Sequence, residues 1–334
     1  MSVEFVCSVL CQIKEMVSGG KRKISFIWHG GEPLLWGIEN YKQVFEFIKS
    51  EFCNSEIKNS IQCNLSLMND EYIELFKQYD VKVGFSLDGP KEMNDSQRVF
   101  ADGGGTFNAI MDKLELCRSR GLNVGCVTVC SRNFIGKIKQ FYQFMNELQL
   151  GLKLNPLFIT GEAINVKDKY GITAKDYAEI MIELFDLMMD DSYNHVEEDN
   201  LLEMASAVAT GISGHCMFGN NCQGQFIAIA PTGDVMPCGR FCDNDLFRYS
   251  YGNLHYETLA DILPRIKQSE TYKRAEYIAQ SDCVRCKWYH ICHGGCLHDG
   301  FLASGDFKHK TFLCPAYKRI FSHIETRLKE KRII

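Results

Sequence analysis

Apolar and polar positions in the first half of the chain follow two alternating patterns. Short apolar runs, typical of buried strands, are separated by segments whose apolar residues recur every three or four positions, as on one helix face. The pattern predicts strands at Lys23–Trp28, Ser60–Ser66, Lys82–Leu87, Leu122–Val129 and Leu152–Phe158. It predicts helices at Glu39–Glu51, Asp70–Gln78, Phe107–Arg120 and Phe134–Leu148. Strands that alternate with helices of this length form βαβ units and a parallel sheet.

The flanking segments extend this picture at both ends. Val3–Val17 predicts an amphipathic helix with no strand before it, so we expect the parallel sheet to lack its first strand. Thr173–Met189 and Glu198–Thr210 predict two further helices. We expect the acidic run between them to be a solvated linker; it contains Asp190, Asp191, Glu197, Glu198 and Asp199.

After Gly211 the texture of the sequence changes. Cysteine, glycine and short turn signals replace the periodic pattern, and only short strands such as Gln225–Ala230 are expected. We therefore predict two domains, residues 1–210 and residues 211–334, the second ending in a helix.

Composition narrows the class of protein. The chain has 334 residues, of which 46% are hydrophobic, and a net charge of −5. This balance does not indicate non-specific nucleic-acid binding. No apolar stretch approaches the roughly 20 residues of a membrane span, and Met1–Leu10 does not have the pattern of a secretory signal. We therefore expect a cytoplasmic protein with neither nucleic acid nor membrane as a partner.

Cysteine use is the strongest chemical signal. A reducing cytosol disfavours disulfides, so sixteen cysteines point to metal binding or catalysis. Eight of them form a framework after residue 211: Cys216-x5-Cys222-x15-Cys238, then Cys283-x2-Cys286-x5-Cys292-x3-Cys296, and Cys314. Eight thiolates make two complete four-ligand sites for iron–sulfur clusters or zinc, and spacing alone does not exclude zinc. We expect Cys53, Cys63, Cys117, Cys126 and Cys130 to pack in the core or beside it.

This framework resembles the SPASM domain of radical S-adenosylmethionine (SAM) enzymes, including its glycine in Gly233-x4-Cys238. The resemblance implies two interleaved auxiliary [4Fe–4S] clusters. Cluster I would be held by Cys216, Cys222, Cys238 and Cys296, and cluster II by Cys283, Cys286, Cys292 and Cys314. Fully ligated clusters would serve structure or electron transfer rather than bind substrate.

The first domain resembles the same family. Gly30-Gly31-Glu32-Pro33 is similar to the family's GGEP motif, and Ser86-Leu87-Asp88-Gly89-Pro90 with Arg98 resembles its SLDGP…R segment. The implied SAM contacts are Gly30, Gly31, Glu32, Asn64, Ser86, Asp88 and Arg98. The implied fold is α/β: a partial (β/α)6 TIM-like barrel missing its first strand, followed by a small cysteine-rich SPASM domain.

One family feature is absent from this sequence. Radical SAM enzymes hold their catalytic cluster on a C-x3-C-x2-C loop, but here Cys7-x3-Cys11 is followed by Lys14. We expect Cys7 and Cys11 to be two thiols on one helix face. The missing strand and loop would be adjacent, so a single N-terminal loss explains both: a shortened chain, a misassigned start or a natural degenerate member. The SAM site is therefore only partly present, and the sequence predicts no catalytic residue.

The resemblance also implies a reaction class. SPASM enzymes mostly modify peptides or proteins, by sulfatase maturation or by cross-linking of ribosomal peptides. In sulfatase-maturating members an aspartate that acts as a base follows the third ligand of cluster I. In this chain that position is Gly239, followed by Arg240. We therefore expect a maturase that forms a cross-link or thioether on a ribosomally made peptide or protein, with a flavodoxin or ferredoxin as reductant.

Two alternatives remain open. A degenerate member with auxiliary clusters only would act as an electron relay or peptide-binding partner. A zinc-stabilised structural protein would use the same cysteine spacing.

Overall fold

The computed structural model describes residues 1–17, 23–190 and 196–334. The chain divides into two compact units, each of which is described by itself. Unit 1 comprises Met1–Val127, Ala228–Gly239 and Ser250–Pro264. Unit 2 comprises Thr128–Ile227, Arg240–Tyr249 and Arg265–Ile334. The boundary predicted near residue 211 marks a change in sequence pattern and does not coincide with the limits of these units. The two predicted domains stay a prediction.

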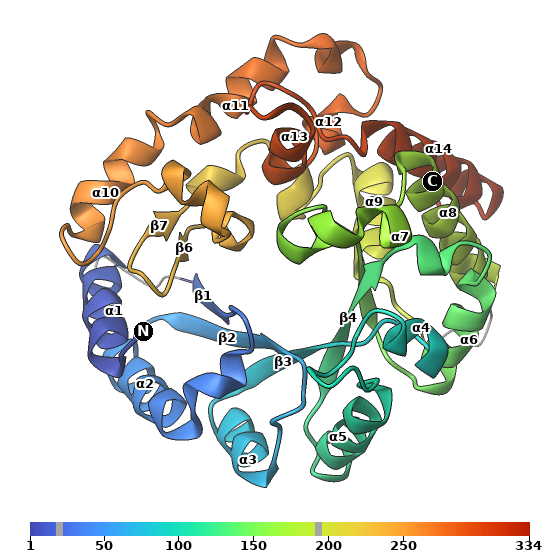
Figure 1. The fold of residues 1–334 in the computed structure, drawn as a ribbon. Coiled ribbons are helices and arrows are strands. Elements are labelled where there is room, and N and C mark those ends of the chain that lie inside the picture. Colours follow the sequence, from blue (N-terminus) through green and yellow to red (C-terminus); the bar gives the residue numbers. More distant parts are fainter. Residues whose placement is uncertain (18–22, 191–195) are drawn as a thin grey trace. The chain divides into compact units, whose positions relative to one another are not determined.

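A five-stranded sheet confirms the predicted α/β class. Its strands lie in the order β1-β2-β3-β4-β5 and form an open, curled half-barrel (Figure 1). The pairs β1/β2, β2/β3 and β3/β4 are parallel. Within the described residues β1 is an edge strand. The strands are β1 (Lys23–Trp28), β2 (Glu56–Cys63), β3 (Val81–Ser86), β4 (Val124–Cys130) and β5 (Leu152–Pro156).

Helices α2 and α3 cover the outer face of the first strands (Figure 1). Tyr41 and Phe45 of α2 pack edge-on against Trp28 of β1, and Tyr41 also meets Phe76 of α3. This aromatic packing holds β1 in place and so positions the turn that follows it. The helices of this part are α1 (Val3–Val17), α2 (Ile38–Glu51), α3 (Asp70–Gln78), α4 (Lys91–Asp95) and α5 (Phe107–Ser119), with α10 (Leu259–Ile266) later in the chain.

Unit 2 is built mainly from helices. Helix α14 packs along α8 and α9. The ring of Phe218 packs against Tyr317 and Phe321 of α14, with centroid distances of 5.0 and 5.4 Å. The helices are α6 (Ile138–Glu147), α7 (Lys167–Tyr170), α8 (Ala174–Asp190), α9 (Asp199–Thr210), α11 (Glu270–Ala279), α12 (Tyr289–Cys292), α13 (Leu297–Ser304) and α14 (Cys314–Glu330).

Three predicted elements differ from the structure by more than two residues at one end or at both. The second strand ends at Cys63 rather than residue 66, because Leu65 takes a left-handed conformation with φ of 63°. The predicted helix from Phe134 begins only at Ile138, because Gly136 has a φ of 72° that no right-handed helix contains. The strand expected at Gln225–Ala230 shrinks to β6 (Ala228–Ile229), which pairs with β7 (Val235–Met236) in an antiparallel ladder.

The acidic run after α8 is not uniformly solvated, so that prediction is wrong at Glu198. This side chain is buried, and its carboxylate accepts hydrogen bonds from the backbone N–H groups of Leu154 (2.7 Å) and Leu201 (2.6 Å). It thereby caps the first turn of α9. Glu197 and Asp199 are exposed, whereas Asp191 lies outside the described residues.

The remaining cysteines mostly follow expectation. Cys63, Cys117, Cys126 and Cys130 are buried, but Cys53 is exposed, so the prediction for Cys53 is wrong. Phe52, the residue that follows α2, takes the buried position there, and the adjacent Cys53 is left exposed.

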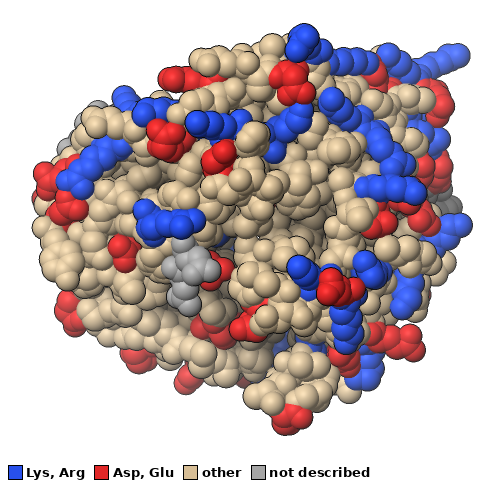
Figure 2. Space-filling view, turned by 45° about the horizontal axis from the view of Figure 1, so that its top comes forward, with Lys and Arg blue, Asp and Glu red and all other residues tan. Residues whose placement is uncertain are grey.

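The surface carries charges of both signs. On the face drawn in Figure 2, basic and acidic side chains are interspersed rather than gathered into a field of one sign. In the described part of the chain, no helix combines the length and the apolar character that a membrane crossing needs.

Candidate functional site

Polar groups follow the carboxyl ends of β1 and β2 in unit 1. Glu32 comes four residues after β1, and its two carboxylate oxygens accept hydrogen bonds from the backbone N–H of Leu34 (3.0 Å) and of Asn64 (2.8 Å). Asn64 directly follows β2, and its side chain accepts from the backbone and hydroxyl of Ser66. Glu32 therefore ties two strand ends together, at the edge where ligands of open α/β sheets bind.

Backbone at the first strand end is open to a ligand. Gly30 has a φ of 131°, a conformation that L-residues rarely adopt, and a side chain at either Gly30 or Gly31 would meet nothing within 4 Å. Such glycines leave room for a polar ligand to approach the main chain closely. The residues present therefore fit the amino acid end of SAM, although contact with SAM stays a prediction.

Asp88 and Arg98 form a pair after the third strand. The Arg98 guanidinium forms a bidentate ion pair with the buried Asp88 carboxylate. Its Nε donates to Oδ2 at 2.6 Å and its Nη2 donates to Oδ1 at 3.2 Å. Gln97 also donates to Oδ2 at 2.6 Å. The Asp88 carboxylate thus shapes the loop between β3 and α5. Ser86, at the end of β3, accepts from the side chain of Gln62 at 3.4 Å.

The four cysteines assigned by resemblance to cluster II surround one cavity in unit 2. Cys283, Cys286, Cys292 and Cys314 all line it, together with aromatic and lysine side chains. Burial raises the pKa of Cys292 to about 12, and the neighbouring Cys314 and other thiols add a smaller increase. Buried thiols of this kind ionise only with a cation beside them, as in a metal site. The four thiols therefore supply the donor type of an iron–sulfur cluster, whose ligand sulfurs are spread around several iron atoms rather than gathered on one ion.

Three of the four cysteines assigned to cluster I also belong to unit 2. Cys216 and Cys222 lie in short 3-10 turns, and Cys296 immediately precedes α13. The Cys222 sulfur accepts from the side-chain amide of Gln223 at 3.3 Å. The fourth, Cys238, belongs to unit 1 and follows β7. Across the described residues, no group of three or more His, Cys, Asp or Glu side chains could hold a single metal ion. The choice between clusters and zinc stays open to experiment.

Arg240 connects the Cys296 sulfur to a carboxylate that the sequence did not single out. Its Nη1 lies 3.6 Å from the Cys296 sulfur and 3.1 Å from Oδ1 of the buried Asp299. The guanidinium also stacks on the ring of Phe158 at 3.9 Å. Asp299 was missed because nothing in its local sequence distinguishes it from a surface acid of a short helix. The arginine next to Gly239 is thus a structural partner of the cysteine framework.

Cys7 and Cys11 lie on α1, one half-buried and the other exposed. Burial raises the pKa of Cys7, with a smaller contribution from Cys11. Both thiols project from the same helix, as predicted from their spacing of four residues.

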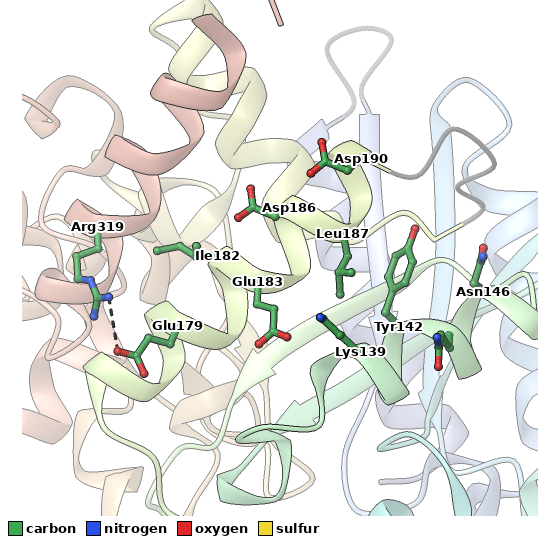
Figure 3. A pocket seen from close by; sticks show the side chains of 11 residues that line it. Lys139, Tyr142, Asn146, Glu179, Ile182, Glu183, Asp186, Leu187, Asp190 and Arg319 are labelled. Carbon is green, nitrogen blue, oxygen red and sulfur yellow. Dashed lines mark ion pairs between the residues drawn. The ribbon is translucent and has the colours of Figure 1, made fainter. Parts of the chain in front are cut away.

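A larger cavity of about 680 Å³ lies between α6 and α8 and contains no cysteine in its lining. Figure 3 shows the acidic side chains of α8 along it, with Glu179 paired to Arg319 of α14. Asp186 and Asp190 are paired with Arg327 of the same helix. These ion pairs explain the acidic lining as a feature of packing between α8 and α14.

Comparisons with known proteins agree with both parts of this description. Residues 9–137 match the profile of the Radical SAM superfamily, and residues 216–296 match that of SPASM, an iron–sulfur cluster-binding domain. The chain is 27% identical to the cysteine-type anaerobic sulfatase-maturating enzyme of Clostridium perfringens (strain 13 / Type A) over 327 residues, 95% of this chain and 85% of that enzyme.

Two solved structures extend the likeness to the fold. Native anSMEcpe with bound AdoMet and Cp18Cys peptide superposes with a TM-score of 0.83 at 23% identity, covering 99% of this chain and 91% of that one. Streptococcus suis SuiB bound to precursor peptide SuiA superposes with a TM-score of 0.64 at 16% identity. The superposition covers 94% of this chain and 69% of SuiB. The half-barrel, the cysteine framework and both profile matches agree: this chain belongs to the radical SAM superfamily and carries a SPASM iron–sulfur domain.

Proposed function

We propose that this protein is a radical SAM/SPASM maturase that modifies a side chain of a peptide or protein. The observation that carries the proposal is the combination of strand-end polar groups at Glu32 and Asn64 with a cavity lined by four cysteines, in a chain whose fold matches such enzymes along nearly its whole length.

The residues have distinct proposed roles. Gly30 and Gly31 would admit SAM to the backbone, and Glu32 and Asn64 would meet its amino group with their remaining acceptor capacity. Ser86 would add a hydroxyl, while Asp88 and Arg98 would hold the adjoining loop. Bound SAM would supply the family's 5′-deoxyadenosyl radical on one-electron reduction by a further cluster with an open iron site, with methionine as the other product.

Two auxiliary clusters are part of the proposal. Cys283, Cys286, Cys292 and Cys314 would hold one, as their shared cavity supports. Cys216, Cys222, Cys238 and Cys296 would hold the other. A low-potential protein reductant such as flavodoxin or ferredoxin would deliver electrons.

Two target classes compete on different observations. Similarity to a cysteine-type anaerobic sulfatase-maturating enzyme over 95% of this chain favours a sulfatase as substrate, against our expectation from the sequence. The position after Cys238, where sulfatase-maturating members have an aspartate that acts as a base, holds Gly239 and no acid. Arg240, which follows it, is paired with Asp299. This difference favours the cross-link or thioether class. Because the similarity extends over nearly the whole chain, a sulfatase is the first substrate to test.

An electron-relay or peptide-binding role is the second candidate function. It is favoured by Lys14, which stands where the third thiolate of a cluster loop would follow Cys7 and Cys11. Such a protein would carry auxiliary clusters without cleaving SAM.

One anaerobic experiment separates these possibilities. The reconstituted full chain is analysed for iron and sulfide, then incubated with SAM, dithionite and a cysteine-containing sulfatase peptide, and 5′-deoxyadenosine and peptide mass are measured. The maturase proposal expects 5′-deoxyadenosine, a changed peptide mass and more iron than the about eight atoms per chain that two auxiliary [4Fe–4S] clusters hold. Iron without SAM cleavage would instead support the electron relay, and a colourless zinc protein would refute both.

A matched pair of variants tests the strand-end site. Glu32→Gln is expected to weaken SAM binding about tenfold or more, because one charged acceptor is lost. Glu39→Gln, an exposed acid on α2, is the control and should bind SAM like the wild type. Equal SAM affinity in both variants would remove Glu32 from the site.

A further inference from the structure

Arg274 is a buried cation whose hydrogen bonds go to backbone carbonyls. It lies on α11 with only 5% of its surface exposed. Its Nη2 donates to the backbone carbonyls of Gly294 (3.1 Å) and His309 (3.4 Å), and its Nε has no hydrogen-bond partner. Among the described residues, the largest charges that raise the pKa of this guanidinium against its burial come from cysteines rather than carboxylates. A buried charge without a counter-charge costs several kcal/mol, so the fold requires negative charge near it.

Thiolates of the cysteine framework can supply negative charge to Arg274. Burial lowers the pKa of its guanidinium, and the thiolates of Cys296, Cys222, Cys292 and Cys283 oppose this effect. Burial raises the pKa of the Cys222 thiol, and the positive charge of Arg274 partly offsets this by favouring the thiolate. Two of these cysteines belong to the set assigned to cluster I, and two belong to the set assigned to cluster II.

The hydrogen bonds of Arg274 reach the segment that links the two sets. Gly294 lies between Cys292, assigned to cluster II, and Cys296, assigned to cluster I. The backbone at Gly294 is left-handed with φ of 82°, a turn that glycine adopts without strain. By holding this carbonyl, Arg274 fixes the turn that sends the chain from one site to the other.

We propose that Arg274 is a shared positioning residue for both auxiliary sites, serving as their common counter-cation and as the clamp of the turn between them. The inference rests on the proposed function, since it requires clusters in both sites. A four-thiolate cluster is an anion that gains one further negative charge when it accepts an electron from a low-potential reductant. A fixed cation nearby stabilises that reduced form and raises the reduction potential.

The test is a redox titration of the full chain with both sites reconstituted, followed by electron paramagnetic resonance and by iron analysis. Arg274→Gln keeps an amide donor but removes the charge, whereas Arg274→Lys keeps the charge. Lys273→Gln is the control, because Lys273 is the neighbouring cation on α11 but is exposed and pairs with Glu270.

For both clusters, Arg274→Gln is expected to lower the ratio of reduced to oxidised form about tenfold at a fixed potential, which corresponds to about 59 mV for a one-electron couple. Arg274→Lys should recover most of this loss, and Lys273→Gln should match the wild type. Loss of iron from both sites in Arg274→Gln, but not in Arg274→Lys, would also support the shared counter-cation.

Other outcomes overturn the inference. Unchanged potentials in a fully loaded Arg274→Gln would refute it, as would a shift confined to one cluster or equal iron loss in both variants. These results would leave the proposed function intact. A wild-type chain that takes up no iron would instead refute the proposed function, and this inference with it.

Discussion

Glu198 offers a direct test of how burial controls a charge in this fold. Its carboxyl group is buried, and burial raises its pKa from 4.5 to about 7, although the N–H groups of Leu154 and Leu201 favour the ionised form. Moving one pKa by this amount corresponds to about 3 kcal/mol of pH-dependent stability. Because the folded pKa is the higher one, this stability is fully present below pH 4.5 and is lost as the pH rises to about 7.

The perturbation is Glu198→Gln, which removes the titration and leaves a neutral acceptor for one of the two N–H groups. The lost hydrogen bond should destabilise α9 locally by about 1–3 kcal/mol. Glu197→Gln is the matched control, since Glu197 precedes it in the chain but is exposed.

Hydrogen–deuterium exchange with mass spectrometry reports the result for the segments that carry the N–H groups of Leu154 and Leu201. After correction for intrinsic exchange, the wild type and Glu197→Gln should lose protection there between pH 5 and pH 8. Glu198→Gln should show a much flatter dependence. A pH dependence in Glu198→Gln as steep as in the wild type would refute the assignment of this effect to Glu198.

Three further predictions concern the candidate sites. Arg98→Ala leaves the buried Asp88 carboxylate without its bidentate partner and should cost about 3 kcal/mol in chemical denaturation; the double variant with Asp88→Asn should recover much of this loss, and no recovery would contradict the pairing. Gly30→Ala forces alanine into a φ of 131° and should cost about 1–3 kcal/mol by thermal unfolding, whereas Gly31→Ala has open space and should be tolerated. Cys286→Ser should remove one cluster, about four iron atoms per chain, as measured by elemental analysis; full iron content would remove Cys286 from the ligand set.

Local periodicity was enough to predict the framework of the sheet. The strand Lys23–Trp28 and the helix Asp70–Gln78 have the predicted limits, because side-chain alternation and helix-face spacing are set by neighbours in the chain. The errors fall where a single backbone conformation decides. The left-handed Leu65 ended a strand early, and no local propensity favours that conformation in a leucine.

Side-chain roles were harder to predict than elements. Glu198 was grouped with solvated acids because its neighbours are acidic, but Leu154 and the first turn of α9 enclose it. Arg98 was recognised by resemblance, yet its fork with Asp88 depends on a loop that returns ten residues later. Such pairings require distances that a sequence does not contain.

The sequence by itself determined the spacing of the eight cysteines, the βαβ order and the turn chemistry after the first strand, because each depends on residues close together along the chain. Only the tertiary structure decided that four of those cysteines share a cavity and that Arg274 is buried beside members of both sets. The physical reason is that burial and electrostatic neighbours come from distant segments, so the cost of a charge such as Arg274 becomes apparent only once the chain has folded around it.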